Sequence, residues 1–289
     1  MASTGAPRGK KKGRSFLYKA RKYGKKGMYG RGKNVDEETY NYFVRVMERL
    51  KEDFEDDEEK GIPNLYPTLL KSSHKLVCTT EIFVTNVFEQ TEEKEMDLMC
   101  NQVISKVIEK LLALAKPETL LKFASICLKE MRIICTDPYA SHVLEALMHI
   151  ALDKVLNGKE EVLGEHQASF QTWLCSICQF TFNNVEDFIM DMYASHIIRT
   201  ALQCVSGVVV GVNVMKSHRS RRHLDSEKVE ATSNQRKMPK AFSEILEEFA
   251  QRFIAWPQLS GTLCSIAHRL GYTGLAISEL LGSSKLSQA

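Results

Sequence analysis

Two short stretches with nearly the same amino-acid sequence predict the fold. They are DPYASHVLEAL at residues 137–147 and DMYASHIIRTA at residues 191–201, and seven of the eleven positions are identical or exchange one aliphatic residue for another. A looser copy, NQVISKVIEKL, occupies residues 101–111. The copies begin 36 and then 54 residues apart, so an insertion of 18 residues, placed near residues 156–171, restores one period. This period predicts an α-solenoid, in which each unit buries its apolar face against the next.

The apolar residues of the three copies predict the core of an all-α chain. Helical periodicity runs through residues 81–210, and no segment alternates convincingly at the two-residue period of a strand. Within each copy, four residues fall on one stripe at helical spacing. The expected core positions are Val103, Val107, Ile108 and Leu111, then Tyr139, Val143, Leu144 and Leu147, then Tyr193, Ile197, Ile198 and Ala201.

A polar stripe recurs beside the core stripe. Its positions are i, i+1 and i+4 of each copy, which share one face of a helix. We therefore expect the same face of every unit to carry these side chains along the array. They are Ser105, Lys106 and Glu109, then Ser141, His142 and Glu145, then Ser195, His196 and Arg199.

This pattern resembles that of the pumilio (PUF) repeat family, and the motif DxYASHVLxAL is similar to the RNA-facing helix of the family's 36-residue repeat. The resemblance implies that Ser141 and Glu145 contact base edges while His142 stacks between bases. It assigns the same roles to the polar stripe of the other two units, with Lys106 and His196 in the stacking position. Together with the basic N-terminus, the repeats look most like the nucleolar pumilio-like branch, the nucleolar protein nine family. The resemblance implies binding to precursor ribosomal RNA during small-subunit maturation, in the nucleus and nucleolus, with pre-ribosomal proteins as further partners.

Charge is strongly segregated along the chain. Residues 1–33 hold twelve Lys and Arg and no acidic residue, which leaves 27 basic and 36 acidic residues elsewhere, a net charge of −9. Such a Gly-rich basic segment predicts a disordered arm that serves nuclear import or binds phosphates. The cations assigned to this role are Lys10, Lys11, Lys12, Arg14, Arg21, Lys22, Lys25 and Lys26.

Changes of pattern divide the chain into six parts. The expected parts are a disordered basic arm (1–35), an acidic amphipathic helix (36–60), an irregular insertion (61–80), three helical repeats (81–210), a basic flexible loop (211–240) and a partial fourth repeat with an irregular tail (241–289). Because the fourth repeat is incomplete, we expect the last unit to expose an apolar face without a cap, which favours aggregation or a partner.

Several function classes find no support in the sequence. No GxSxG, HExxH or GxxxxGK[ST] motif is present, so we expect no enzyme activity, no cofactor and no small-molecule substrate. The longest apolar runs are too short to span a membrane. Cys175 and Cys178 have CxxC spacing, but their apolar helical setting favours core thiols over a metal or redox site. The alternative to RNA binding is a protein-interaction scaffold of the HEAT or armadillo type, which the acidic body favours.

Overall fold

Helices make up nearly all regular structure in the described part of the chain. The computed structural model describes residues 16–52, 74–157, 160–207 and 238–254, and within them the β-structure is one isolated bridge between Gly32 and Asn101. None of the described helices is long and apolar enough to cross a membrane.

A unit of three helices occurs three times. Each unit has a short helix, a first-layer helix and a second-layer helix. The units are α5 (Glu95–Met99), α6 (Ile104–Leu112) and α7 (Pro117–Cys127); α8 (Met131–Thr136), α9 (Ala140–Asn157) and α10 (Glu160–Asn183); and α11 (Val185–Phe188), α12 (Ala194–Ser206) and α13 (Lys240–Ile254). The short helices and the first-layer helices both start at intervals of 36 and 54 residues, the two intervals of the sequence copies.

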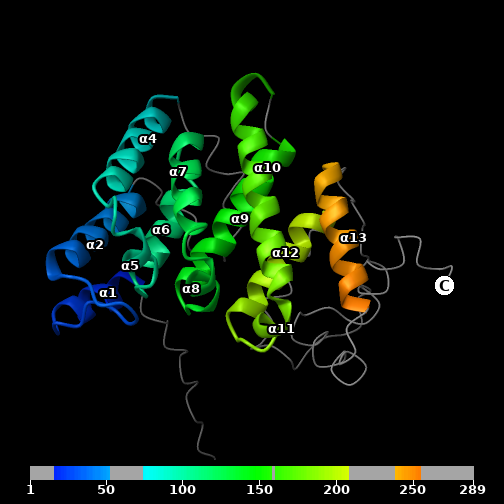
Figure 1. Ribbon diagram of the computed structural model, residues 1–289. Helices are drawn as coiled ribbons and strands as arrows, with labels where there is room; N and C mark the ends of the chain where they lie inside the picture. The colour runs from blue at the N-terminus through cyan, green and yellow to red at the C-terminus, as the bar shows by residue number, and fades with distance from the viewer. Residues whose placement is uncertain (1–15, 53–73, 158–159, 208–237, 255–289) are drawn as a thin grey trace, which may run out of the picture.

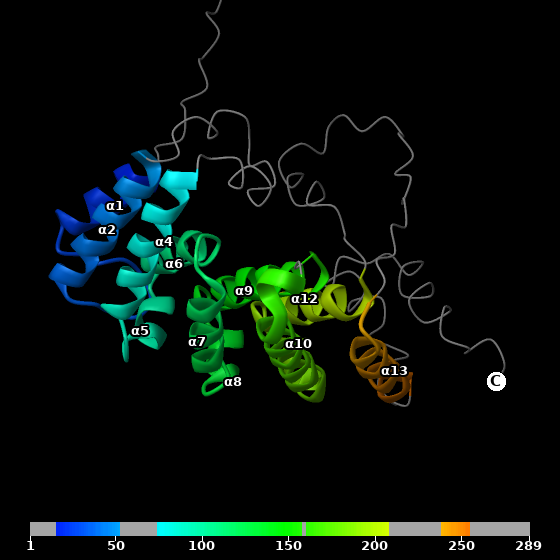
Figure 2. The same ribbon diagram turned by 90° about the horizontal axis from the view of Figure 1, so that it is seen from above.

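The units stack side by side as two layers. Figure 1 shows α4, α7, α10 and α13 standing next to one another as the second layer. In the first layer, α6 packs against α9 and α9 packs against α12. Figure 2 shows α9 and α12 on the opposite side of the array from α7, α10 and α13. This is the architecture of an α-solenoid.

One carboxylate or amide at the same repeat position begins each first-layer helix. The Oδ1 atom of Asp137 accepts the backbone N–H groups of Tyr139 and Ala140, both at 2.8 Å. Asp191 accepts those of the two equivalent residues of unit three at 2.8 and 2.7 Å. In unit one the acceptor is Asn101, at 3.0 and 3.2 Å. These bonds satisfy N–H groups that have no partner inside the helix, so the Asp or Asn of each copy sets the start of its helix.

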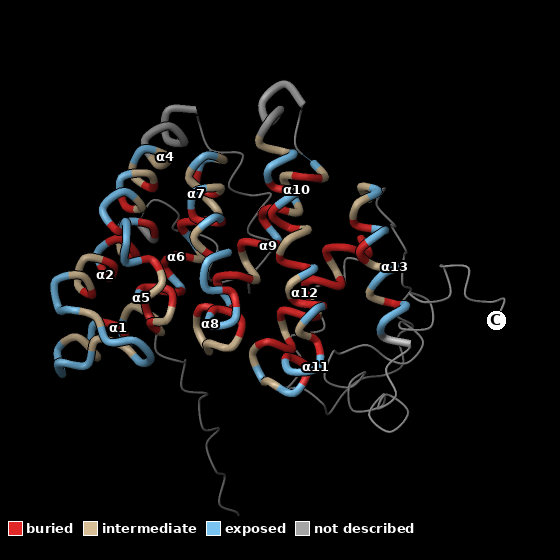
Figure 3. The backbone as a smooth tube through the Cα atoms, in the orientation of Figure 1, coloured by how far each residue is buried: buried red, intermediate tan, exposed pale blue. Residues whose placement is uncertain are grey.

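The core runs continuously between the layers (Figure 3). Ten of the twelve predicted core positions are buried, which confirms the stripe. Tyr139 and Tyr193 are half-buried instead. Trp173 of α10 joins units one and two within the second layer, because its Nε1–H donates to the Ala124 carbonyl of α7 at 2.8 Å.

The prediction of disorder for the whole basic arm is wrong for its second half. Residues 16–35 form α1 (Phe16–Gly24) and an extended segment that returns to the array. Ala20 and Tyr40 are buried in a small second core, and the Tyr40 hydroxyl donates to the Ala20 carbonyl at 3.1 Å. The arm folds because its Phe and Tyr side chains and Ala20 find apolar partners on α2 and α6. Residues 1–15 lie outside the described part.

An additional helix pair, α2 (Glu37–Glu52) and α4 (His74–Glu89), precedes unit one. The acidic helix predicted for 36–60 is described to residue 52. The irregular insertion predicted for 61–80 differs from the structure at its end, because α4 begins at His74. Residues 53–73 lie outside the described part.

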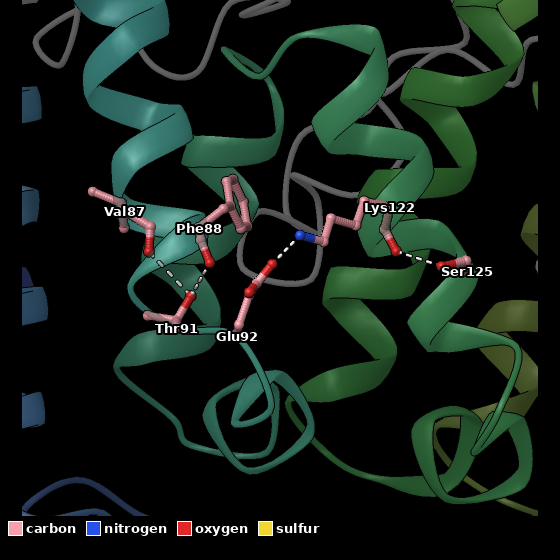
Figure 4. A network of polar contacts seen from close by, with 6 residues as sticks. All are labelled: Val87, Phe88, Thr91, Glu92, Lys122 and Ser125. Carbon is pink, nitrogen blue, oxygen red and sulfur yellow. Dashed lines mark hydrogen bonds and ion pairs between the residues drawn. The ribbon is translucent and has the colours of Figure 1, made fainter.

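Polar contacts join the end of α4 to α7 (Figure 4). The Thr91 hydroxyl donates to the carbonyls of Val87 and Phe88, both at 3.1 Å, at the end of α4. Just beyond it, Glu92 forms an ion pair with Lys122 of α7. The rings of Phe88 and Phe123 also meet edge to face, with their centroids 5.5 Å apart. The second layer therefore extends from α4 to α7 across the boundary of unit one.

One prediction about the later units needs correction. The insertion placed near residues 156–171 falls where α9 is followed by α10, and these helices have 18 and 24 residues against 9 and 11 in α6 and α7. The helix predicted to open a fourth repeat at 241 is α13, which packs on α12 and α10 as the second-layer helix of unit three. The segment predicted as a loop at 211–240 falls outside the described part, apart from residues 238–240.

Candidate functional site

The predicted site residues lie on the three adjacent first-layer helices α6, α9 and α12. The structure separates them into two groups by exposure. The three serines are buried, with exposed fractions of 2% for Ser105, 3% for Ser141 and 8% for Ser195. The other six are exposed or half-buried, and we call them the polar row: Lys106, Glu109, His142, Glu145, His196 and Arg199.

Two of the three serines donate their hydroxyls to carbonyls at the helix starts. Ser195 Oγ donates to the Met192 carbonyl at 3.1 Å, and Ser105 Oγ donates to the Gln102 carbonyl at 3.4 Å. Both acceptors lie three residues earlier, at the turn into the helix. A base edge would have to compete with these bonds, so the polar row holds the side chains that are free to meet a ligand.

Glu145 joins units two and three. Its Oε1 accepts a hydrogen bond from the Thr200 hydroxyl of α12 at 3.1 Å, and its Oε2 lies 3.6 Å from His142 Nδ1. Thr200 is almost fully buried, so the carboxylate is anchored at the junction of the two helices. We did not predict a role for Thr200. The signal is present in DMYASHIIRTA, where a threonine occupies the position of Ala146.

The charges of the row act on one another across the units. Pairing with Glu145 raises the pKa of His142 and outweighs the opposing effect of its burial. Burial by itself would raise the pKa of Glu145, but the contacts from His142 and Thr200 prevail and lower it. Burial raises the pKa of Glu109, against the effects of His142 and Lys106. His142 thus carries positive charge to higher pH than a free histidine does.

Unit three ends the row with a basic pair. Arg199 Nη2 contacts His196 Nδ1, one turn apart on α12. Burial and the neighbouring guanidinium lower the pKa of His196, so this ring is the neutral partner of the pair. The stacking positions of the three units therefore present an ammonium, an imidazole with a raised pKa and a neutral imidazole. All three can lie against the face of a base.

Comparison with known proteins identifies the family to which the chain belongs. A protein-family model described as the NOP9-like PUF repeat domain matches residues 93–262. The chain belongs to this family. The matched region begins just before α5, so α1, α2 and α4 all precede it. The resemblance stated from the sequence is confirmed.

The named relatives of this chain are longer proteins than the chain itself. Nucleolar protein 9 of Yarrowia lipolytica is 25% identical over 186 residues, which cover 59% of this chain and 25% of that protein. Nucleolar protein 9 of Candida albicans is 23% identical over 262 residues, covering 82% and 34%. The chain thus spans about a quarter to a third of the length of these relatives.

Solved structures show the same fold. The structure described as APUM23-GGAAUUGACGG superposes with a TM-score of 0.52 at 18% identity, covering 88% of this chain and 44% of that one. The α-solenoid prediction is confirmed by this likeness and by the family match.

Four of the eight predicted basic residues lie in the described part of the chain, and they precede the PUF repeats. Arg21 forms an ion pair with Glu48 of α2 at 2.7 Å, which raises the pKa of its guanidinium. Lys22, Lys25 and Lys26 are exposed. The remaining four, Lys10, Lys11, Lys12 and Arg14, lie outside the described part of the chain.

The cysteine pair belongs to the core of the PUF repeats. Cys178 is fully buried near the Ala201 carbonyl, 3.9 Å from its sulfur, and burial raises the pKa of its thiol well above the ordinary value. Cys175 is half-buried and its pKa is raised for the same reason. Among the described residues, no group of His, Cys, Asp and Glu is arranged to hold a metal ion.

Proposed function

We propose that this chain binds single-stranded RNA along the polar row of α6, α9 and α12. The observation that carries the proposal is the alignment of one stacking and one edge position from each of three consecutive PUF repeats. These positions are tied across the units by Glu145, Thr200 and His142. Bases stacked on Lys106, His142 and His196 would lie one per repeat, since each repeat contributes one such side chain.

The biological target we propose is precursor ribosomal RNA in the nucleolus, during maturation of the small ribosomal subunit, with pre-ribosomal proteins as further partners. The relatives carry the name Nucleolar protein 9, and the superposed APUM23 structure contains a base sequence written with U, as RNA is. The activity is binding: no catalytic or cofactor role is proposed.

The geometry refines how the repeats would meet bases. We propose that Glu109, Glu145 and Arg199 provide the edge contacts and that the three serines contribute less than the family pattern implies. The serines are buried, and two of them donate to backbone carbonyls. Glu145 keeps one oxygen on Thr200 and can accept from a base with the other.

A binding assay with matched variants tests the proposal. The row variant carries Lys106→Ala, His142→Ala and His196→Ala. Its control carries Lys122→Ala on α7, Lys129→Ala just beyond α7 and His166→Ala on α10. These are two lysines and one histidine, against one lysine and two histidines in the row variant, and all three lie off the first-layer helices.

Because one stacked base is worth about 1–3 kcal/mol, losing three stacking groups should weaken binding to a single-stranded precursor-rRNA segment by at least about 100-fold. The control should bind like the parent chain. Equal losses in both variants, or none in the row variant, would contradict the proposal.

A protein-interaction scaffold is the second candidate function. It is favoured by the net charge of −9 outside residues 1–33 and by the exposed apolar side chains of Ile133, Met190 and Met192. The same assay separates the two functions, because a scaffold without RNA readout would show no difference between the row variant and its control.

A further inference from the structure

The folded half of the basic segment is fastened to unit one by a short clasp, residues 28–35. The Lys33 N–H donates to the Cys100 carbonyl at 3.0 Å, and the Gln102 N–H donates to the Arg31 carbonyl at 2.8 Å. These two bonds form the isolated bridge between the clasp and the turn into α6. The clasp therefore lies at the N-terminal end of the first helix of the polar row.

Asn101 has a second role that an aspartate could not fill. Its Oδ1 begins α6, as Asp137 and Asp191 do for their helices. Its Nδ2 donates to the carbonyls of Tyr29 and Lys33 in the clasp, at 2.8 and 3.0 Å. An amide can accept and donate together, whereas an ionised carboxylate only accepts. The change from Asp to Asn in unit one thus coincides with the one unit that holds the clasp.

Two glycines allow the clasp to lie this close. Gly32 has a φ of +89°, and a Cβ there would lie 2.1 Å from the Cys100 carbonyl oxygen and 2.7 Å from the Tyr139 ring of unit two. Gly30 has a φ of +93° and touches Asn101 in the same way. Both the backbone conformation and the contact distance exclude a side chain at these positions. The clasp therefore has one defined position against units one and two.

The clasp and α1 carry a basic patch that continues the polar row. The Lys106 ammonium lies 5.5 Å from the centre of the Phe16 ring, so α1 starts at the first stacking position. Lys19 and Lys22 follow Phe16 at three-residue intervals along α1. We call Lys19, Lys22, Lys25, Lys26 and Arg31 the basic patch; all are exposed, and none forms an ion pair with a carboxylate in the described part of the chain.

We propose that the clasp holds the basic patch in a fixed position to bind the phosphates of RNA that leaves the polar row at unit one. This rests on the proposed function. Charge complementarity favours RNA as the occupant, because the chain outside residues 1–33 is net negative and offers little attraction to phosphate. Continuity favours it too, since Phe16 and Lys106 join the patch to the row. The patch acts as a positioned surface and not as a loose tail.

Asn101→Asp tests whether the clasp positions the basic patch, and it leaves every cation of the patch in the chain. The carboxylate should still begin α6, as it does in units two and three, but it loses both donors and repels the carbonyls of Tyr29 and Lys33. Asp191→Asn is the matched control, since it makes the converse exchange at the start of α12 in unit three, away from the clasp. Hydrogen exchange at the Lys33 and Gln102 amides reports release of the clasp, and Gly32→Val provides a second way to release it.

RNA affinity is then measured against salt for each variant. Each lost phosphate contact on single-stranded RNA should make the slope of log K against log salt shallower by about 0.7, so losing three or four contacts changes it by about 2–3. We expect this change in Asn101→Asp, in Gly32→Val and in the triple variant Lys19→Gln, Lys22→Gln and Lys26→Gln, with no change in Asp191→Asn.

Two other results have distinct meanings. If exchange shows that the clasp is released while affinity and salt slope stay at the parent values, the inference is overturned and the row alone can still bind RNA. If the row variant with alanine at Lys106, His142 and His196 binds RNA like the parent chain, the proposed function itself fails.

Discussion

Alanine at the three equivalent helix starts should cost unequal amounts of stability. Asp137→Ala and Asp191→Ala each remove an acceptor of two backbone N–H groups at 2.7–2.8 Å. Loss of such a cap lowers the free energy of unfolding by about 1–2 kcal/mol. Asn101→Ala removes the same two bonds and also both donors to the clasp.

The additional loss at Asn101 can be estimated from its surroundings. The residue is fully buried, so the carbonyls of Tyr29 and Lys33 are left facing a methyl group. Each hydrogen bond contributes about 1 kcal/mol net, so the two bonds to the clasp bring the cost of Asn101→Ala to about 3–4 kcal/mol. Asp137→Asn keeps the acceptor and should cost under about 0.5 kcal/mol.

Urea denaturation followed by circular dichroism measures these differences. The free energy of unfolding should be highest for the parent chain and slightly lower for Asp137→Asn. The single variants Asp137→Ala and Asp191→Ala should come next with similar values, and Asn101→Ala should have the lowest value. If Asn101→Ala proves no more destabilising than Asp137→Ala, then Asn101 does not hold the clasp and the dual role assigned to its amide is wrong.

Three further predictions concern other parts of the array. Trp173→Phe removes the hydrogen bond to the Ala124 carbonyl and some buried volume, so urea denaturation should show a loss of about 1–3 kcal/mol; an unchanged midpoint would argue against this link between units one and two. Glu145→Gln should lower the pKa of His142 toward 6.5, as followed by NMR titration. With a folded pKa above the unfolded one, the stability that the pair contributes is present at low pH and is lost as the pH rises through the folded pKa. A His142 pKa that stays raised in Glu145→Gln would contradict the pairing. Thiol reagents should modify the four buried cysteines of the native chain only after unfolding, because burial raises their pKa values and excludes the reagent; rapid labelling of the folded protein would contradict their burial. These four are Cys127, Cys135, Cys178 and Cys204.

The repeat register could be predicted from sequence because its determinants are local. Asp137 and Asp191 bond to backbone groups two and three residues later, and the apolar stripe follows within one helix. Pro117 likewise marks the first residue of α7, where proline lacks only an N–H that has no helical partner. Such short-range features leave a pattern that repeats with the unit.

Features that depend on contacts between distant residues could not be predicted in the same way. Asn101 lies 72 residues from Tyr29, and only their meeting orders a segment whose composition resembles that of disordered chains. Helical spacing gives only the face on which Ser105, Ser141 and Ser195 lie and does not give their burial. Thr200 lies 55 residues from Glu145, so their hydrogen bond depends on the stacking of units two and three.

The central claim is that RNA lies along the first-layer helices of the PUF repeats. Cross-linking of a 4-thiouridine-substituted single-stranded RNA to the intact chain, followed by mass spectrometry, tests it most directly. We expect cross-links in peptides spanning residues 101–112, 137–149 and 191–203. Further cross-links should occur in residues 16–35 when the RNA is extended beyond unit one. Cross-links confined to the second-layer helices α7, α10 and α13, or to the basic N-terminal segment alone, would contradict it.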